Sequence, residues 1–315
     1  MALRGYLVGS FPRPAKLIKL LRDYSKGKVG REQVESEVDK TVEMVVRIQV
    51  ENKLAYVSDG MLLWDDLFRP FSTIVDGVEV DGLSRWFDNN VFYKKLVVKD
   101  RLVLKKPLGD MFYKPAGNHP SKLILPDPYT AATLSENNYY RSFEELAYDW
   151  AEVIGQTAAS VKNVQQLQLT APSLVFEKVS TDHLETAREC VRIVRNKARC
   201  ELLIHTPFGP LSNALPGILD FPVDVVGVDL LKTRISHLSE YSIDKHLYLG
   251  VLDGRNTLPE DVETVVSTIE NLFSKTGLKN ADVGPTCELE FLPFEPAVDK
   301  VKKLGEVLER AAEKI

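Results

Sequence analysis

Short apolar runs recur along the chain, and a segment with a helical pattern separates most of them from the next. Eight runs have the length and composition of strands: Leu3–Val8, Leu54–Val57, Lys122–Leu125, Gln165–Leu169, Leu202–His205, Val223–Val228, Leu247–Leu252 and Ala281–Val283. Apolar and polar residues do not alternate cleanly within them. This pattern is expected of parallel strands that pack against helices on one face and face a barrel core on the other.

The segments between these runs carry the spacing and capping signals of helices. Helices are predicted at Arg31–Glu51, from Ser142 to about Val161, at Thr181–Lys197, at Pro259–Lys275 and at Pro296–Lys314. Alternation of strand and helix over the whole length favours one α/β domain, residues 1–315, folded as a single (β/α)8 TIM barrel. A glycine-rich GxGxxG turn does not follow the first strand, so neither a doubly wound sheet nor a nucleotide cofactor is expected.

Residues 70 to 120 break this rhythm. Alternating apolar residues and turn signals in Val75–Gly82 and Lys95–Leu104 predict a β-hairpin insertion after the second strand. Such a hairpin would cover the mouth of the barrel, contact a partner chain, or be a passive excursion, and the sequence leaves these three alternatives open.

Composition and charge exclude several classes of function. The chain has 44% hydrophobic and 27% charged residues and a net charge of −5, so it gives no reason to expect binding to nucleic acid or to an anionic membrane. Its three cysteines are too few and too scattered for a disulfide framework. A secretory signal and an apolar run of about 18 residues are both lacking, so a cytoplasmic protein is predicted.

Glycine, proline and polar residues gather in the loops that follow the predicted strands, which is where barrel enzymes place their reacting groups. The cations in these loops suit a carboxylate- or phosphate-bearing ligand, because arginine binds such groups with two parallel hydrogen bonds. The predicted substrate-binding residues are Ser10, Arg13, Lys16, Lys19, Asp253, Arg255 and Asn256.

A metal site is a further possibility at the same strand ends. Zinc takes three or four converging nitrogen, sulfur or oxygen ligands. Our candidates are His205, Asp229 and Cys287, which follow or end different strands and lack the tight spacing of a zinc motif. The sequence also contains no GxSxG, P-loop or HExxH motif, so catalytic residues are not assigned.

Several of these loops resemble the cobalamin-independent methionine synthase family. Gly9–Arg13 is similar to its opening GSFPR-type motif, Pro126–Thr130 to its strand-three loop, and Gly250–Asn256 together with Cys287 to the amino-terminal barrel of its two-barrel members. The resemblance follows the whole chain in order. It implies a barrel of the methionine synthase and uroporphyrinogen decarboxylase-like class.

In that family the carboxyl-terminal barrel holds zinc and homocysteine and methylates the homocysteine thiol. The present sequence departs from that barrel's motifs: Met61 replaces a glutamate, Ala171 lies within the place of an acidic D-E-P motif, and Arg255 replaces a histidine. The resemblance therefore implies a subunit in methionine biosynthesis that supports a separate, homologous zinc-containing barrel. Its small-molecule partner would be homocysteine or a methyl donor of the folate or corrinoid type. The alternatives are a stand-alone zinc-dependent methyltransferase acting on a thiol or a corrinoid, and a non-catalytic binding protein.

Overall fold

The computed structural model describes residues 3–314 of the chain. Its strands are β1 (Leu3–Gly5), β2 (Val75–Arg85), β3 (Phe92–Leu104), β4 (Ser121–Pro126), β5 (Glu136–Asn137), β6 (Val164–Thr170), β7 (Glu201–Thr206), β8 (Val225–Asp229), β9 (His246–Leu252) and β10 (Ala281–Pro285). Its helices are α1 (Ala15–Ser25), α2 (Arg31–Glu51), α3 (Phe71–Ile74), α4 (Gly109–Phe112), α5 (Pro128–Leu134), α6 (Phe143–Ser160), α7 (Thr181–Lys197), α8 (Ile235–Leu238), α9 (Val262–Thr276) and α10 (Phe294–Lys314).

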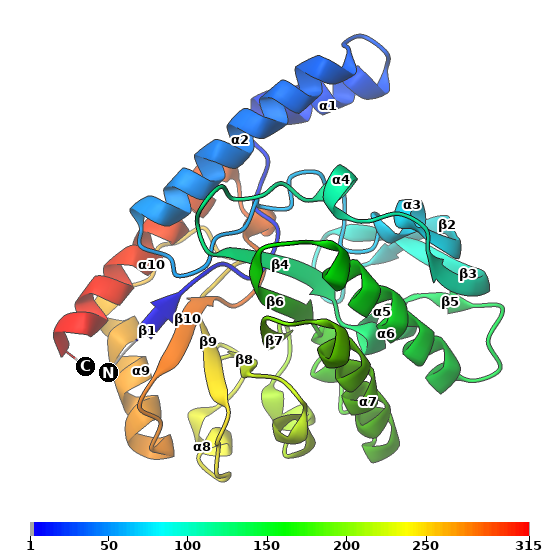
Figure 1. Ribbon diagram of the computed structural model, residues 1–315. Coiled ribbons are helices and arrows are strands. Elements are labelled where there is room, and N and C mark those ends of the chain that lie inside the picture. Colours follow the sequence, from blue (N-terminus) through cyan, green and yellow to red (C-terminus); the bar gives the residue numbers. More distant parts are fainter. Residues whose placement is uncertain (1–2, 315) are drawn as a thin grey trace.

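Seven strands form one curled parallel sheet in the order β1-β10-β9-β8-β7-β6-β4, with helices around it (Figure 1). The expected eighth strand, Leu54–Val57, is not part of this sheet. It makes one parallel bridge, between Val57 and Ser121, and the Ala55 N–H donates to the carbonyl of Gly5 at 2.8 Å. The segment thus lies between β1 and β4 without a regular ladder, and a complete eight-stranded barrel is not confirmed.

A second, three-stranded sheet holds most of residues 70 to 104. In it β2 pairs with β3 in antiparallel fashion, and β5, which comes later in the chain, lies parallel to β3. Because β5 comes from beyond residue 120, the second sheet is tied to the rest of the chain and does not consist of a hairpin alone.

Capping side chains set the helix boundaries. Helices α2 and α7 have the bounds expected from the sequence, and the Ser142 hydroxyl accepts the N–H of Glu145 at the start of α6, at 3.2 Å. Helix α9 begins at Val262 instead of Pro259, because the Asp261 carboxylate accepts the N–H of Thr264 at 2.9 Å and so caps the helix after the proline.

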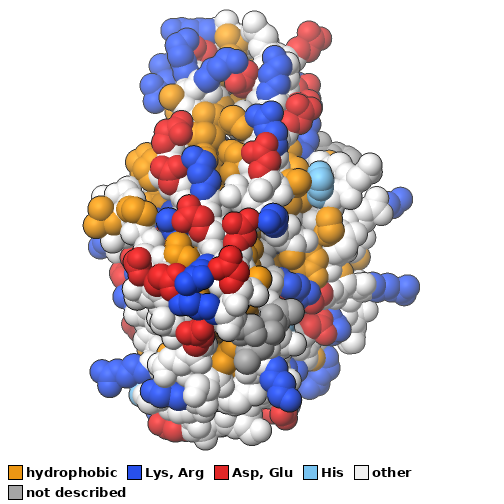
Figure 2. All heavy atoms as spheres, turned by 90° about the vertical axis from the view of Figure 1, so that its left-hand side faces the viewer, with side chains coloured by type: hydrophobic (Ala, Val, Ile, Leu, Met, Phe, Trp, Pro, Cys, Tyr) orange, Lys and Arg blue, Asp and Glu red, His pale blue; other side chains and the backbone are white. Residues whose placement is uncertain are grey.

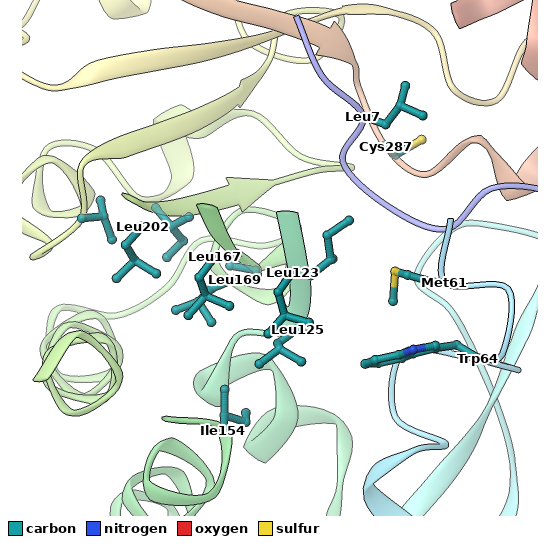
Figure 3. Packing of buried hydrophobic residues seen from close by; sticks show 14 of the residues in the cluster. Leu7, Met61, Trp64, Leu123, Leu125, Ile154, Leu167, Leu169, Leu202 and Cys287 are labelled. Carbon is teal, nitrogen blue, oxygen red and sulfur yellow. The ribbon is translucent and has the colours of Figure 1, made fainter. Parts of the chain in front are cut away.

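The outward faces of the strands pack against the surrounding helices. Leucines of β4 and β6 lie together above Ile154 of α6 in the view of Figure 3, and all of them are buried. These residues are Leu123, Leu125, Leu167 and Leu169. None of the helices between residues 3 and 314 is long and apolar enough to cross a membrane.

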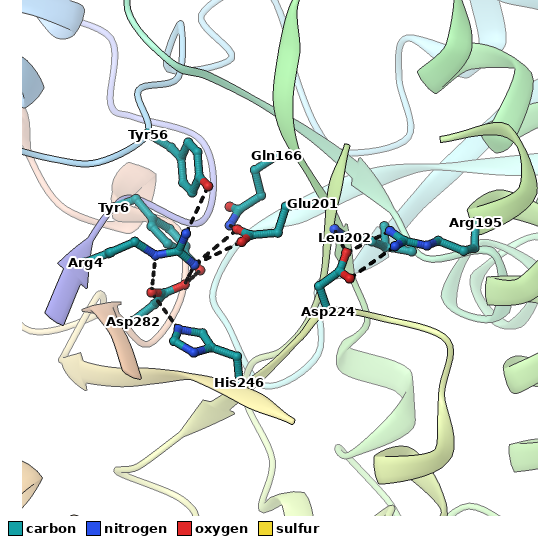
Figure 4. Close-up of polar contacts among 10 residues, drawn as sticks. All are labelled: Arg4, Tyr6, Tyr56, Gln166, Arg195, Glu201, Leu202, Asp224, His246 and Asp282. Atoms are coloured by element: carbon teal, nitrogen blue, oxygen red, sulfur yellow. Dashed lines mark hydrogen bonds and ion pairs between the residues drawn. The ribbon is translucent and has the colours of Figure 1, made fainter. Parts of the chain in front are cut away.

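The inward face of the sheet is polar at the amino-terminal ends of its strands (Figure 4). Arg4 of β1 donates from Nε to the buried Asp282 of β10 at 2.7 Å and from Nη2 to Glu201 of β7 at 3.1 Å. Lys122 of β4 is fully buried, with its Nζ 3.9 Å from the ring centroid of Tyr6. These charged side chains hold strands together at the amino-terminal end of the sheet, which lies opposite the strand-end loops.

Candidate functional site

A cavity of about 390 Å³ lies at the carboxyl-terminal ends of the strands. Its volume lies within the range of small-molecule sites, and this is the face on which barrel enzymes bind their ligands. Its walls come from the loops after β1 and β10, from the segment after Val57 and from the β2–β3 region. The lining residues are Val8, Gly9, Ser10, Met61, Trp64, Asp65, Asp66, Leu67, Trp86, Val91, Phe92, Tyr93, Ile124, Thr170, Glu288, Glu290 and Phe291.

A sharp turn after Val57 brings part of this wall into place. Gly60 and Met61 both have positive φ angles, 73° and 52°. The buried Asp59 carboxylate holds the turn by accepting the N–H of Met61 at 2.9 Å and the N–H of Lys114 at 2.9 Å. Burial raises the pKa of Asp59 to about 6, although these hydrogen bonds oppose the shift. The result is that Met61 and Trp64 line the cavity.

The tip of the β2–β3 hairpin, residues 86–91, covers the mouth. The indole N–H of Trp86 donates to Glu288 in the loop after β10 at 2.9 Å, and its ring meets the ring of Phe208 edge to face at 6.3 Å. Arg255, in the loop after β9, donates to Asp88 of the tip at 3.0 Å. Among the three alternatives left open by the sequence, these contacts support a cover over the strand ends.

Two glutamates of the loop after β10 line the cavity. Gly9 allows Glu288 to approach closely, since a Cβ at position 9 would lie 2.4 Å from the Cβ of Glu288. The Ser10 hydroxyl donates to Glu290 at 2.6 Å. Burial raises the pKa of Glu288 to about 7, and it also raises the pKa of Glu290. Glu288 can therefore hold or release a proton near neutral pH.

Sequence reasoning assigned no role to Glu288, Glu290 or Trp86. The two glutamates stand at alternate positions in the loop after the last strand, and this spacing is visible in the sequence. Trp86 gave no such signal, because its partner Glu288 lies 202 residues away along the chain.

Two of the residues predicted to bind substrate follow β1. Ser10 lines the cavity, and its hydroxyl donates to Glu290. Arg13 supports the wall from behind, where its Nε donates to the carbonyl of Leu62 at 2.8 Å and its Nη1 lies 3.4 Å from the Asp65 carboxylate. Arg13 is not among the lining residues.

Lys16 and Lys19 lie on α1, away from the cavity lining. Lys16 is 74% exposed and pairs with Glu37 of α2 at 2.6 Å, and Lys19 is 81% exposed and pairs with Asp23 at 3.2 Å. On the face that carries α1, α2 and α10, basic and acidic side chains are interspersed (Figure 2). A role of Lys16 and Lys19 in binding substrate stays a prediction.

The remaining predicted residues belong to the loop after β9. Asp253 and Asn256 hold the turn, because their side-chain oxygens accept the N–H groups of Arg255 at 2.9 Å and of Leu258 at 3.0 Å. Arg255 then reaches the hairpin tip. Direct contact of these residues with a substrate stays a prediction.

The predicted metal ligands do not form a closed set. His205 is fully buried, and burial, aided by the charge of Lys122, lowers its pKa to about 3. The Asp229 carboxylate already accepts the N–H groups of Leu231 at 3.0 Å and Lys232 at 3.2 Å. In residues 3–314 no three or more histidine, cysteine, aspartate or glutamate side chains are grouped so that they could hold a metal ion.

Cys287 is buried as well. It lies beside Leu7 (Figure 3), and a Cβ on Gly254 would come within 2.8 Å of its Sγ. Burial raises the pKa of the thiol, which opposes formation of the thiolate that binds metals. As arranged, His205, Asp229 and Cys287 do not fit a zinc ion, and zinc binding by them stays a prediction.

Comparison with known proteins agrees with this architecture. Residues 76–277 match the sequence model of the cobalamin-independent synthase N-terminal domain. A methionine synthase of Sulfolobus acidocaldarius is 25% identical over 304 residues, which cover 94% of this chain and 88% of the relative.

Solved structures show the same fold. A B12-independent methionine synthase from Shewanella sp. W3-18-1, in complex with selenomethionine, superposes with a TM-score of 0.84 at 17% identity and covers 100% of this chain and 99% of its own. A methyltransferase from Methanosarcina mazei superposes with a TM-score of 0.59 at 12% identity, over 98% of this chain and 93% of its own. Together with the matched segment, which spans well over half of the chain, these findings confirm the resemblance seen in the loops. The chain belongs to the cobalamin-independent methionine synthase family, through the N-terminal domain of that family.

Proposed function

We propose that this chain is a subunit of a methionine-forming system, in which it binds a small ligand and supports a separate zinc-containing catalytic barrel of the same family. The observation that carries the proposal is a covered cavity at the strand ends, in a family fold whose described residues 3–314 offer no cluster of metal ligands. Family membership supplies the reaction class, which is methyl transfer to homocysteine.

The chemistry of that transfer explains the division of labour. Homocysteine must lose its thiol proton before it attacks a methyl group, and a metal ion stabilises the thiolate. The thiol of Cys287 is buried, which raises its pKa, and Met61 lines the cavity where the family resemblance calls for an acid. We therefore assign thiol activation to the partner barrel and ligand binding to this chain.

A mixing assay tests the proposal. Methyl transfer to homocysteine is measured with a zinc-containing barrel from the same genome, with this chain, and with both together, while gel filtration reports whether the two associate. We expect the mixture to exceed the sum of the separate rates. The Glu288→Gln variant should weaken the effect, and Glu306→Gln, at an exposed position of α10, should preserve it.

Other outcomes would favour the alternatives. If the zinc barrel works equally well without this chain and the two do not associate, the proposal is wrong. Turnover by this chain alone, with one zinc per chain that is lost in Cys287→Ser, would indicate an independent methyltransferase. Ligand binding with neither turnover nor stimulation would indicate a binding protein.

A further inference from the structure

The charged residues that line the cavity all carry the same sign. Four acidic residues line the cavity, and no lysine, arginine or histidine is found among its described lining residues; the four are Asp65, Asp66, Glu288 and Glu290. The guanidinium group of Arg13 donates to the carbonyl of Leu62 and lies 3.4 Å from the Asp65 carboxylate, and that of Arg255 bonds to the hairpin tip. An anionic ligand would meet repulsion here, whereas a cationic ligand would be attracted.

Glu288 and Glu290 both belong to the loop after β10, where Glu288 is half-buried and Glu290 is exposed. They lie two residues apart in one loop. Desolvation by the surrounding chain raises the pKa of both groups, and the charge of Glu290 raises the pKa of Glu288 further, so ionising both is unfavourable without a cation. Each already accepts one hydrogen bond from the protein, from Trp86 and Ser10 respectively. Among the described residues, no lysine or arginine forms an ion pair with either glutamate, although the charge of Arg255 lowers the pKa of Glu288 and that of Arg13 lowers the pKa of Glu290.

Much of the remaining wall is aromatic, and the polar hydrogens of its tryptophans and its tyrosine are already bonded within the chain. The indole N–H of Trp64 donates to the carbonyl of Phe112 at 2.7 Å, and the indole N–H of Trp86 donates to Glu288. The hydroxyl of Tyr93 donates to the carbonyl of Leu134 at 3.1 Å. These side chains, with Phe92 and Phe291, therefore offer the cavity ring surfaces instead of polar hydrogens.

We infer that the cavity binds a methyl-substituted organic cation, with a quaternary ammonium or sulfonium group held between the aromatic wall and the carboxylates of Glu288 and Glu290. Aromatic rings attract such cations through their negative faces, and the attraction grows as water is excluded. A methylated cation needs no hydrogen-bond acceptors, whereas a primary ammonium needs up to three. Asp66 cannot easily supply them, because its carboxylate already accepts the N–H groups of Phe68, Arg69 and Lys94.

The inference rests on the proposal that this cavity is the ligand site, and it names the class of ligand. Calorimetric titration of the full chain tests it with three probes of similar shape. These are choline, its neutral isostere 3,3-dimethylbutan-1-ol, and the primary amine ethanolamine. We expect choline to bind one site per chain at least tenfold more tightly than either of the others.

The outcomes discriminate clearly. If the neutral alcohol binds as tightly as choline, the cavity selects for apolar shape and not for charge. If ethanolamine binds more tightly than choline, the site prefers a primary ammonium. Absence of choline binding would refute the inference. Glu288→Gln should weaken the affinity for choline at least tenfold and leave the affinity for the neutral alcohol unchanged. Glu306→Gln should bind all three probes like the unaltered chain. If Glu288→Gln does not fold, the three-probe series on the unaltered chain still decides.

A pH series gives a second readout. Protonation of Glu288, whose pKa burial raises to about 7, removes a charge that the ligand needs. Choline binding should therefore weaken as pH falls through about 7, and binding of the neutral alcohol should not. The other charged groups that act on Glu288 are Glu290, which raises its pKa, and Arg255, which lowers it.

The test is independent of methyl transfer, since it needs neither homocysteine nor the partner barrel. Choline binding without stimulation in the mixing assay would uphold the ligand class and overturn the proposed function. Stimulation without choline binding would uphold the proposed function and overturn the inferred ligand class.

Discussion

Replacing Asp282 by asparagine is expected to destabilise the fold strongly. The carboxylate is buried at the amino-terminal end of the sheet, where it accepts four hydrogen bonds (Figure 4). Two come from Arg4, at 2.7 and 2.8 Å, one from the Tyr6 hydroxyl at 2.7 Å, and one from Nε2 of His246 at 2.8 Å. An asparagine would present an N–H₂ group to at least one of these donors and would leave Arg4 without its closest anion.

The size of the loss follows from burial. Breaking a buried ion pair by removing one partner costs about 3–5 kcal/mol. Asp282 is fully buried, but the side chain of Arg4 is 34% exposed and also pairs with Glu201, so water and Glu201 recover part of the loss. We therefore expect Asp282→Asn to lower the free energy of unfolding by about 2–4 kcal/mol at pH 7.

The effect has a defined pH dependence. Burial raises the pKa of Asp282, but hydrogen bonds and charges from His246 and Arg4 outweigh burial and hold the pKa below its ordinary value of 3.8. A carboxyl group with a depressed pKa stabilises the fold above its ordinary pKa, and this contribution is lost as pH falls through the folded-state pKa. The deficit of the variant should thus be complete at pH 7 and shrink only below pH 3.8.

Urea denaturation measures both quantities, with a circular dichroism signal and a common m value. Asp299→Asn is the matched control, because Asp299 is 67% exposed and pairs with Lys302 on the surface, so its replacement should change the free energy by no more than about 0.5 kcal/mol. A loss below about 1 kcal/mol for Asp282→Asn would refute the assigned role of this network. A deficit that grows in acid would refute the direction of the pKa shift.

Three further predictions concern the mouth. Arg255→Ala should release the hairpin tip, so that limited proteolysis cuts between β2 and β3 faster at nearly unchanged global stability; unchanged proteolysis would mean that the aromatic contacts alone hold the tip. Gly9→Ala should displace Glu288, weaken choline binding at least tenfold and lower the melting temperature. Unaltered choline binding would contradict the close approach of Gly9 to Glu288. Cys287 should react with Ellman's reagent far more slowly than the partly exposed Cys200 in the folded protein, and the two rates should converge in urea.

The sequence was informative where local rules decide the structure. The bounds of α2 and α7 and the cap at Ser142 follow from side-chain spacing and short-range hydrogen bonds. The order of the strands in the main sheet follows from the alternation of strand and helix. The same rules wrongly place Leu54–Val57 in the main sheet. The segment has only four residues, and its neighbours Gly5 and Ser121 are far away in the chain, so local patterns do not determine its pairing.

The candidate site was less predictable, because its character depends on which charges find partners across the fold. Lys16 is in a strand-end region by sequence, yet Glu37 of the next helix neutralises it on the surface. Within residues 3–314 no lysine or arginine lies in hydrogen-bond range of Glu288, and the position of Glu288 at the cavity depends on the missing side chain of Gly9. The same contacts explain why the sequence of these loops predicts a cationic site although the cavity that they enclose is acidic. The cations of these loops are bonded to other groups of the chain, whereas acidic residues line the cavity. The charge of the ligand that we infer therefore follows from which side chains are paired, and not from the composition of the loops.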